Sequence, residues 1–317
     1  FFRQLEADDV RVANALVHMD GTKIMGRSEN LTGEPYEMSG EERILYYTQE
    51  FRGSYGHVAL LGLQRFIMPF IGGARGTPYA PDVLKLAHID AAYNQGGIAG
   101  FVHPYNGPVD TPQRAATADI PVHVALGRGD FFDVVSIASL EMESTEMYYR
   151  LLNCGFRLAA TGGTDNFSDV WLDPSGGTAR TYVHIDGAPP LTFSGWLDGV
   201  REEKTFGTNG PLLFLNVGHG RLSPGTMLEP GEEFALESTD DTTFDISLAV
   251  TSLAPLDRVE IIVNGSIAHT WGEPDFVGYN PNEVWNLSTT IELLGSGWIA
   301  ARASGPPSEY VGDAFPF

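Results

Sequence analysis

Apolar and polar residues follow two different patterns along the chain, one before and one after residue 207. In the first part, some segments repeat apolar residues at helical spacing and others form short strand-like runs. The helical spacing predicts helices over residues 2–17, 82–93, 143–153 and 193–203. The runs predict strands over residues 49–63 (two strands around a glycine turn), 98–102, 131–138, 157–160 and 178–185. This alternation of strands and helices favours a parallel α/β architecture.

The last part of the chain has the pattern of an antiparallel β domain. Short strand-like runs are separated by turns rich in Gly, Pro and Asn, such as Asn264-Gly265. The runs cover residues 212–217, 233–236, 245–251, 259–263, 285–291 and 298–303. We therefore expect two domains, an α/β domain over residues 1–205 and a β-sandwich over residues 206–317.

Segments rich in glycine, proline and polar residues predict loops over residues 21–40, 66–79 and 104–121. The loop over residues 66–79 is a candidate lid for a nearby site. The sequence starts at Phe1 inside a helical pattern and ends at Phe317 in a loop pattern. We therefore expect the natural protein to extend beyond both ends, so that any signal peptide would lie outside this sequence.

Four side chains of the kinds that bind metals stand at the ends of predicted strands. Glu50 and His57 flank the predicted hairpin turn. His103 follows the next strand, where Pro104 fixes the backbone, and Asp165 follows a glycine-rich turn after a later strand. Barrels of the α/β class build their sites from the carboxyl ends of strands, and carboxylate with imidazole suits Zn, Mn or Fe. Each residue alone has an ordinary structural explanation, but the four together predict a metal site.

Several other polar residues are secondary candidates. Arg180 lies in a predicted strand shortly after Asp165, where it could hold an anionic group of a substrate or pair with a ligand carboxylate. A structural salt bridge explains Arg180 equally well. With Glu50 and His103, Arg180 completes the expected catalytic set. The other secondary candidates are Asp9, Glu141, Glu143, Asp169 and His184. The remaining histidines lack supporting context and are expected on the surface or in the core: His18, His88, His123, His219 and His269.

Composition and charge exclude some functions. The 317 residues include 41 Asp and Glu against 19 Lys and Arg, and the net charge of −22 argues against nucleic acid and anionic membranes as partners. No apolar run approaches the roughly 20 residues of a membrane span. The single cysteine, Cys154, excludes an intrachain disulfide and is expected to be a small buried residue rather than a nucleophile. Walker, Rossmann and nucleophile-elbow motifs are absent from the sequence.

Several short segments, taken together, point to a known family. They are Gln49-Glu-Phe51 with Gly56-His57, Gly100-Phe-Val-His-Pro104, Leu151-Leu-Asn-Cys-Gly-Phe-Arg157, Gly162-Gly-Thr-Asp165, Arg180-Thr-Tyr-Val183 and Thr208-Asn-Gly-Pro-Leu-Leu213. In these segments the chain resembles the carbaryl-hydrolase type (CehA/McbA) metallohydrolases of the polymerase and histidinol phosphatase (PHP) superfamily. The resemblance extends over residues 1–300.

The resemblance implies a distorted (β/α)7 barrel followed by a β domain, with two or three divalent ions (Zn, Mn or Fe) bound in the barrel. It implies that Glu50 bridges these ions and that His57, His103 and Asp165 complete their shells. Asp9 would match an acidic residue early in the barrel.

Two features depart from the pattern of the superfamily. Its opening His-x-His pair is not in this sequence, and we expect that pair upstream of Phe1. Phe167 stands where the wider superfamily has a histidine after its final aspartate. The carbaryl-hydrolase branch also lacks this histidine, so the second departure is mild.

The expected function is hydrolysis of an ester, carbamate or phosphoester bond in a small molecule by metal-activated water. The alternative is a non-catalytic relative that uses its two domains for binding or assembly. A glycan-binding β domain would rest on Trp271, Trp285 and Trp298, for which core packing is the simpler expectation. The oligomeric state is open, with a homo-oligomer as one option. The compartment is also open, and the acidity favours a periplasmic or extracellular setting.

Overall fold

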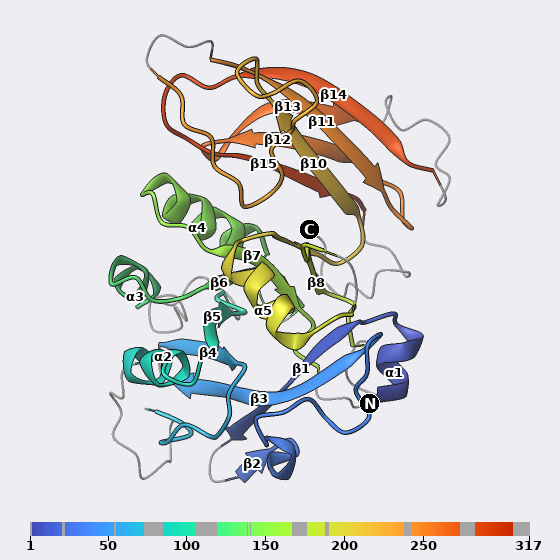
Figure 1. Ribbon diagram of the computed structural model, residues 1–317. Helices are drawn as coiled ribbons and strands as arrows, with labels where there is room; N and C mark the ends of the chain where they lie inside the picture. The colour runs from blue at the N-terminus through green and yellow to red at the C-terminus, as the bar shows by residue number, and fades with distance from the viewer. Residues whose placement is uncertain are drawn as a thin grey trace. The chain divides into compact units, whose positions relative to one another are not determined.

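The structure is a computed structural model of the 317-residue chain (Figure 1). It describes residues 2–20, 23–53, 55–72, 85–105, 119–137, 139, 141–166, 176–187, 190–237, 242–272 and 283–306. The chain forms two compact units. The first consists of Phe1–Ser144 with Leu158–Gly207, and the second of Thr145–Arg157 with Thr208–Phe317.

A seven-stranded mixed sheet forms the centre of the first unit. Its strands are β1 (Val12–Asp20), β2 (Lys23–Met25), β3 (Ile44–Gly53), β4 (Gly56–Leu61), β5 (Ile98–Val102), β6 (Phe131–Ser136) and β7 (Ala159–Gly163). Their order is β2-β1-β3-β4-β5-β6-β7. This unit also contains α1 (Phe2–Ala7), the 3-10 turn η1 (Ser28–Asn30), α2 (Lys85–Tyr93), α3 (Ile120–Ala125), α5 (Phe193–Arg201) and a small sheet of β8 (Arg180–Val183) and β9 (Thr205–Thr208). The observed class is therefore α/β, as predicted, but the sheet is mixed rather than parallel because β2 and β4 run antiparallel to their neighbours.

The pairing directions bring several strand ends to one edge of this sheet. β1 is parallel to β3, and β5, β6 and β7 are parallel to one another. β4 is antiparallel to both β3 and β5, so β3 and β5 run in the same direction. The carboxyl ends of these five parallel strands and the first residues of β4 therefore share one edge. Proteins of the α/β class place their sites at such an edge.

Side-chain alternation along β3 supplies both faces of the sheet with apolar residues. Ile44 and Tyr46 belong to a buried cluster that includes Phe193 of α5, and the rings of Tyr46 and Phe193 stack at 4.0 Å. Phe51 lies on the opposite face of the strand, where its ring stacks on His88 of α2 at 3.8 Å. Helices α5 and α2 therefore cover opposite faces of the sheet near β3.

The amino-terminal segment differs from its predicted form. One helix is predicted over residues 2–17, but α1 ends at Ala7 and β1 begins at Val12. The apolar residues of this segment fit both a helical and an alternating pattern. Pairing of β1 with β3, six residue pairs long, decides in favour of the strand. The prediction of a single helix here is therefore wrong.

Other predicted elements of the first unit correspond to observed ones with shifted ends. The hairpin over residues 49–63 is present as β3 and β4, although β3 already begins at Ile44. Helix α3 (Ile120–Ala125) begins at the end of the segment predicted as a loop over residues 104–121, and β2 and η1 lie inside the predicted loop over residues 21–40. Of the candidate lid, residues 73–79 lie outside the described residues. The described part pairs with β3 through Ile71 and Arg52.

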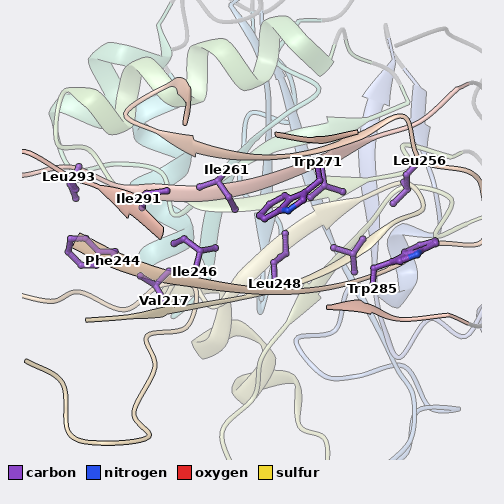
Figure 2. Close-up of a cluster of buried hydrophobic side chains, with 12 residues drawn as sticks. Val217, Phe244, Ile246, Leu248, Leu256, Ile261, Trp271, Trp285, Ile291 and Leu293 are labelled. Atoms are coloured by element: carbon purple, nitrogen blue, oxygen red, sulfur yellow. The ribbon is translucent and has the colours of Figure 1, made fainter. Parts of the chain in front are cut away.

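The second unit contains two three-stranded antiparallel sheets, as expected for a β domain. Their strands are β10 (Leu212–Gly218), β11 (Thr243–Thr251), β12 (Arg258–Val263), β13 (Ser266–Gly272), β14 (Trp285–Glu292) and β15 (Ile299–Ser304). The strand orders are β10-β11-β14 and β13-β12-β15. Residues of both sheets share one hydrophobic core (Figure 2), which includes Val250, Val259, Trp271 and Trp285. Strand β13 was not predicted, and the strand predicted over residues 233–236 is not present.

Helix α4 (Glu141–Asn153) lies mostly in the second unit. The ring of Tyr149 packs 4.9 Å from that of Trp298, whose indole nitrogen donates to Asn153 Oδ1 at 2.8 Å. The Asn153 amide in turn donates to the carbonyl of Asn264 at 3.2 Å. A helix that lies between two strands of the first sheet in sequence therefore packs on residues of the β domain.

Cys154 is exposed, in contrast to its expected burial. It lies in the turn that ends α4, where Gly155 adopts a left-handed backbone with φ of 82°, so its side chain does not reach a core. In the described parts of the chain, no helix combines the length and the apolarity needed to cross a bilayer.

A substitution at Gly100 tests the packing of β5 against β6. A Cβ atom at Gly100 would lie 2.2 Å from the buried ring of Phe131, whereas at Gly40 it would have no neighbour within 4 Å. We expect Gly100→Ala to lower the free energy of unfolding by about 1–3 kcal/mol. Gly40→Ala should leave it nearly unchanged. Urea denaturation of the two variants checks this, and equal stabilities would contradict the described packing.

Candidate metal centre

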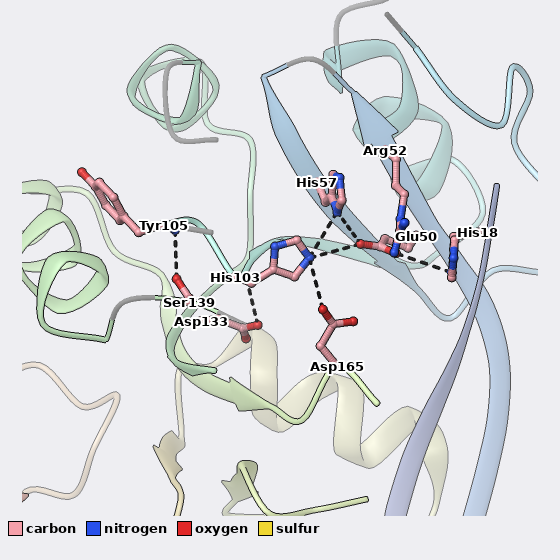
Figure 3. Close-up of polar contacts among 9 residues, drawn as sticks. All are labelled: His18, Glu50, Arg52, His57, His103, Tyr105, Asp133, Ser139 and Asp165. Atoms are coloured by element: carbon pink, nitrogen blue, oxygen red, sulfur yellow. Dashed lines mark hydrogen bonds and ion pairs between the residues drawn. The ribbon is translucent and has the colours of Figure 1, made fainter. Parts of the chain in front are cut away.

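Three side-chain atoms converge at the strand-end edge of the first sheet (Figure 3). His57 Nδ1 lies 2.8 Å from Glu50 Oε1 and 3.2 Å from His103 Nε2, and His103 Nε2 lies 3.3 Å from Glu50 Oε1. Two ligands of a tetrahedral ion with bonds of about 2.0–2.1 Å are separated by about 3.3 Å. This buried group could therefore hold a metal ion.

Strand pairing explains why these residues meet. In the β3–β4 hairpin, Glu50 pairs with Ala59 and Arg52 pairs with His57, which places Glu50 and His57 on one face near the turn. His57 also pairs with Val102, the residue before His103. The ladder β3-β4-β5 thus brings together residues that are 53 positions apart in sequence.

Two of the four predicted metal ligands adopt an unusual backbone. His103 has φ of 32° and Asp165 has φ of 50°, in the left-handed region that non-glycine residues seldom enter. Such conformations cost about 1–3 kcal/mol each and persist where the surrounding structure enforces them. They occur here directly after β5 and after β7, and both residues lie at the candidate centre.

Opposing effects set the charge of the central residues. Burial alone would raise the pKa of Glu50, but hydrogen bonds with His103 and His57 and the charge of Arg52 hold this pKa well below its usual range. Burial lowers the pKa of His57. Burial would also lower the pKa of His103, but Glu50 and Asp165 reverse the direction and raise it. The centre therefore keeps an ionised carboxylate at neutral pH, next to an imidazole that burial favours in its neutral form.

Asp133 lies beneath this centre and was not selected from the sequence. Its side chain accepts hydrogen bonds from the Thr161 hydroxyl at 2.7 Å and from the His103 backbone N–H at 3.4 Å. Burial raises the pKa of Asp133 to about 6. The carboxyl group therefore helps to hold the turn at His103. Its place inside a predicted apolar strand was the signal that could have indicated it.

His18 also belongs to this region, although it was expected on the surface or in the core without a role. Its side chain is 8% exposed, and Nδ1 lies 3.8 Å from Glu50 Oε2. Burial, and after it the charge of Arg52, lowers the pKa of His18. The role of His18 was missed because a helix was predicted over residues 2–17, so no strand was expected to end near His18.

Arg52, like Asp133, was not identified from the sequence. Its Nε donates to Glu50 Oε2 at 3.0 Å, and its side chain is 20% exposed, against 2% for Glu50. Glu50 and Arg52 are two positions apart in one strand, so they share a face. That spacing could have identified Arg52 from the sequence.

Asp165 and Arg180 lie at different distances from the centre. Asp165 Oδ2 lies 3.8 Å from His103 Nε2, so Asp165 borders the three ligand atoms. Arg180 donates from Nε to the carbonyl of Gly177 and from Nη1 to that of Asp8. In the described residues, the structure therefore places Arg180 on backbone carbonyls and not beside Glu50.

The secondary candidates are spread over the chain. Asp9 is exposed and lies 3.5 Å from Arg43, and His184 lies 3.6 Å from Asp186. Glu141 and Glu143 are in the first turn of α4, and Asp169 and Phe167 lie outside the described residues. The other histidines contact neighbours away from the centre, with His88 on Pro69, His123 on Asp119, His219 on Phe234 and His269 on Trp271.

The donor set itself fits a divalent cation. One carboxylate oxygen and two imidazole nitrogens suit Zn, Mn or Fe. The nitrogens of His57 and His103 both approach the same oxygen of Glu50 and each other. When both nitrogens are unprotonated, their lone pairs and the oxygen repel one another, and a cation at their centre satisfies all three.

Comparison of this chain with protein-family models, with curated proteins and with solved structures finds no match.

Titration of Asp133 makes the free energy of unfolding depend on pH, and this dependence can be measured in the presence of a chelator. The pKa of its carboxyl group is about 6 in the folded state and 3.8 in its unperturbed form. Between these values the unfolded state releases its proton first, so the free energy of unfolding falls as pH rises. Asp133→Asn lacks this titration, and Thr161 can accept from the new amide.

From pH 4 to pH 7, we expect Asp133→Asn to gain about 2–3 kcal/mol of stability relative to the wild type. Urea unfolding of both proteins at several pH values checks this. A constant difference across this range would show that Asp133 does not titrate as described.

Proposed function

We propose that this chain is a metal-dependent hydrolase that cleaves an ester, carbamate or phosphoester bond of a small molecule. The observation that carries the proposal is the buried convergence of Glu50 Oε1, His57 Nδ1 and His103 Nε2. The resemblance to carbaryl-hydrolase type enzymes of the PHP superfamily supports the same chemistry. It also implies that the mixed sheet belongs to a distorted (β/α)7 barrel followed by a β-sandwich.

The central residues bind the cation and set its charge environment. A divalent cation held there supplies Lewis acidity and lowers the pKa of water. Glu50 contributes a full negative charge at neutral pH, because its pKa lies well below the usual range. His57 offers a neutral nitrogen, because burial lowers its pKa. These three ligands define one ion position. A second ion, which the resemblance implies, would share Glu50 and use Asp165 or His18.

Two residues beside the ligands have the chemistry to assist the reaction. Arg52 carries the positive charge next to Glu50, so it can stabilise negative charge that develops on an oxygen of the substrate. In this proposal it takes the role that the sequence suggested for Arg180. Asp165 is 29% exposed and borders His103, so its carboxylate can accept a proton from the attacking water and then pass it to the leaving group.

Hydrolysis by the Zn²⁺- or Mn²⁺-loaded protein tests the proposal. The wild type should cleave at least one of p-nitrophenyl acetate, a p-nitrophenyl carbamate and p-nitrophenyl phosphate. Glu50→Gln removes the ionised ligand and should lower kcat/KM by about 100-fold. Glu29→Gln, at an exposed carboxylate, is the control and should retain activity. A wild type that binds the ion but cleaves none of the three would favour the alternative, a non-catalytic relative.

Arg52 and Arg180 form a matched pair of arginines. Arg52→Met should lower kcat by about 10²–10³-fold, because charge on the substrate oxygen loses its stabilising partner. Arg180→Met removes hydrogen bonds to the Gly177 and Asp8 carbonyls, so it should lower stability and largely spare kcat. Steady-state kinetics of both variants shows which of the two arginines stabilises the charge on the substrate oxygen. A greater loss of kcat in Arg180→Met would reverse this assignment.

A further inference from the structure

A second group of buried charged residues lies next to the metal-ligand hairpin. Lys85, the first residue of α2, is 2% exposed, and its Nζ lies 2.6 Å from Asp119 Oδ1. The other oxygen of Asp119 lies 3.0 Å from Nε2 of His123, which is 3% exposed. We call Lys85, Asp119 and His123 the Lys85 network. The residues of this network are not metal ligands in the candidate centre.

The Lys85 network holds the turn that carries His57. Lys85 Nζ donates to the backbone carbonyl of Tyr55 at 2.7 Å. Tyr55 precedes Gly56, which pairs with Gly53 at the end of the hairpin, so Gly56 alone separates Tyr55 from His57. A hydrogen bond from a buried ammonium is stronger than one between neutral groups.

The backbone next to His57 needs such a support. Gly56 has φ of 102°, a conformation that glycine adopts easily and can also leave easily. The carbonyl of Tyr55 is fixed by Lys85 on one side of Gly56, and His57 pairs with Val102 on the other. Loss of the first contact leaves the turn free to shift His57 relative to Glu50 and His103.

Packing alone does not explain a charge at this position. An apolar residue could cover the sheet from α2 without the cost of burying an ammonium group. Burial lowers the pKa of Lys85, and the charge of Asp119 opposes that effect. Burial would raise the pKa of Asp119, but His123 and Lys85 together lower it, so the carboxylate stays ionised. Asp119 therefore keeps Lys85 charged, and the charged ammonium group of Lys85 donates a hydrogen bond to the carbonyl of Tyr55.

We propose that Lys85, held by Asp119 and His123, is a positioning residue for the metal ligand His57. It sets the affinity and the geometry of the ion without touching it. Groups that orient metal ligands typically change affinity by about 10–100-fold when they are removed. The inference rests on the proposed function only in that the centre binds a divalent cation, and it does not depend on hydrolysis.

Binding of Co²⁺ tests the proposal, because its visible absorption reports both affinity and ligand geometry. Lys85→Met keeps the length of the side chain and removes the ammonium group. We expect its Kd for Co²⁺ to rise by about 10-fold or more, with a changed visible spectrum. Arg302→Met is the matched control, because it removes the arginine that lies 2.6 Å from the buried Glu260 of the second unit and leaves only Arg258, at 3.3 Å, as an arginine partner in the described residues. That variant should lose stability and retain the Kd and spectrum of the wild type.

A double variant separates positioning from stability. Lys85→Met alone leaves Asp119 without its ammonium partner and should lower Tm. Lys85→Met/Asp119→Leu removes both charges and should recover much of that Tm, as replacement of both partners of a buried pair often does. Its Kd for Co²⁺ should stay about 10-fold or more above that of the wild type, because Tyr55 still lacks its donor.

The double variant also decides the case if Lys85→Met fails to fold. A double variant with the Kd and spectrum of the wild type would overturn the positioning role and leave the Lys85 network as a structural ion pair. A wild type that binds Co²⁺ but hydrolyses nothing would contradict the proposed function and leave this test intact. A wild type that does not bind Co²⁺ would overturn both.

Discussion

Burial of the Glu50 carboxylate is the constraint on which the rest of the site depends. A buried carboxylate without partners costs several kcal/mol, so the surrounding chain must supply charge or hydrogen bonds. One oxygen meets His57 and His103, and the other meets Arg52 and lies near His18. Four residues thus converge on one carboxylate. Arg52, His57 and His18 come from strands β3, β4 and β1, and His103 directly follows β5. The same arrangement that satisfies Glu50 also creates a set of ligands for a cation.

The order of the strands makes this convergence geometrically simple. Antiparallel β4 lies between β3 and β5, so the start of β4 reaches the same edge as the ends of its neighbours. The left-handed backbone of His103 and Asp165 then turns the chain toward that edge after β5 and β7. Further residues hold the ligands in place. Asp133 accepts a hydrogen bond from the backbone N–H of His103, and Lys85 donates one to the carbonyl of Tyr55 in the hairpin turn. Ligands on strands and supports from neighbouring elements are the usual basis of a rigid site.

The sequence predicted the parts of this arrangement that depend on local pattern. Glu50, His57 and His103 were identified because each stands at the end of an apolar run, and the structure brings their three side-chain atoms within 4.8 Å of one another, where they could hold one ion. His18 was missed because the residues before it fit both a helical and a strand period, and only pairing with β3 decides. The Lys85 network was missed for a different reason. Its members lie 30 or more residues from Tyr55 in sequence. A hydrogen bond to a backbone carbonyl also requires no particular side chain at the accepting residue, so the pattern of residue types does not indicate it.

Anomalous X-ray diffraction from crystals of the Zn²⁺-loaded protein, recorded at the zinc absorption edge, tests the central claim most directly. The account predicts an anomalous peak at about 2.0–2.2 Å from Glu50 Oε1, His57 Nδ1 and His103 Nε2. A map in which zinc occupies only other sites, with these three side chains hydrogen-bonded to one another, would contradict it.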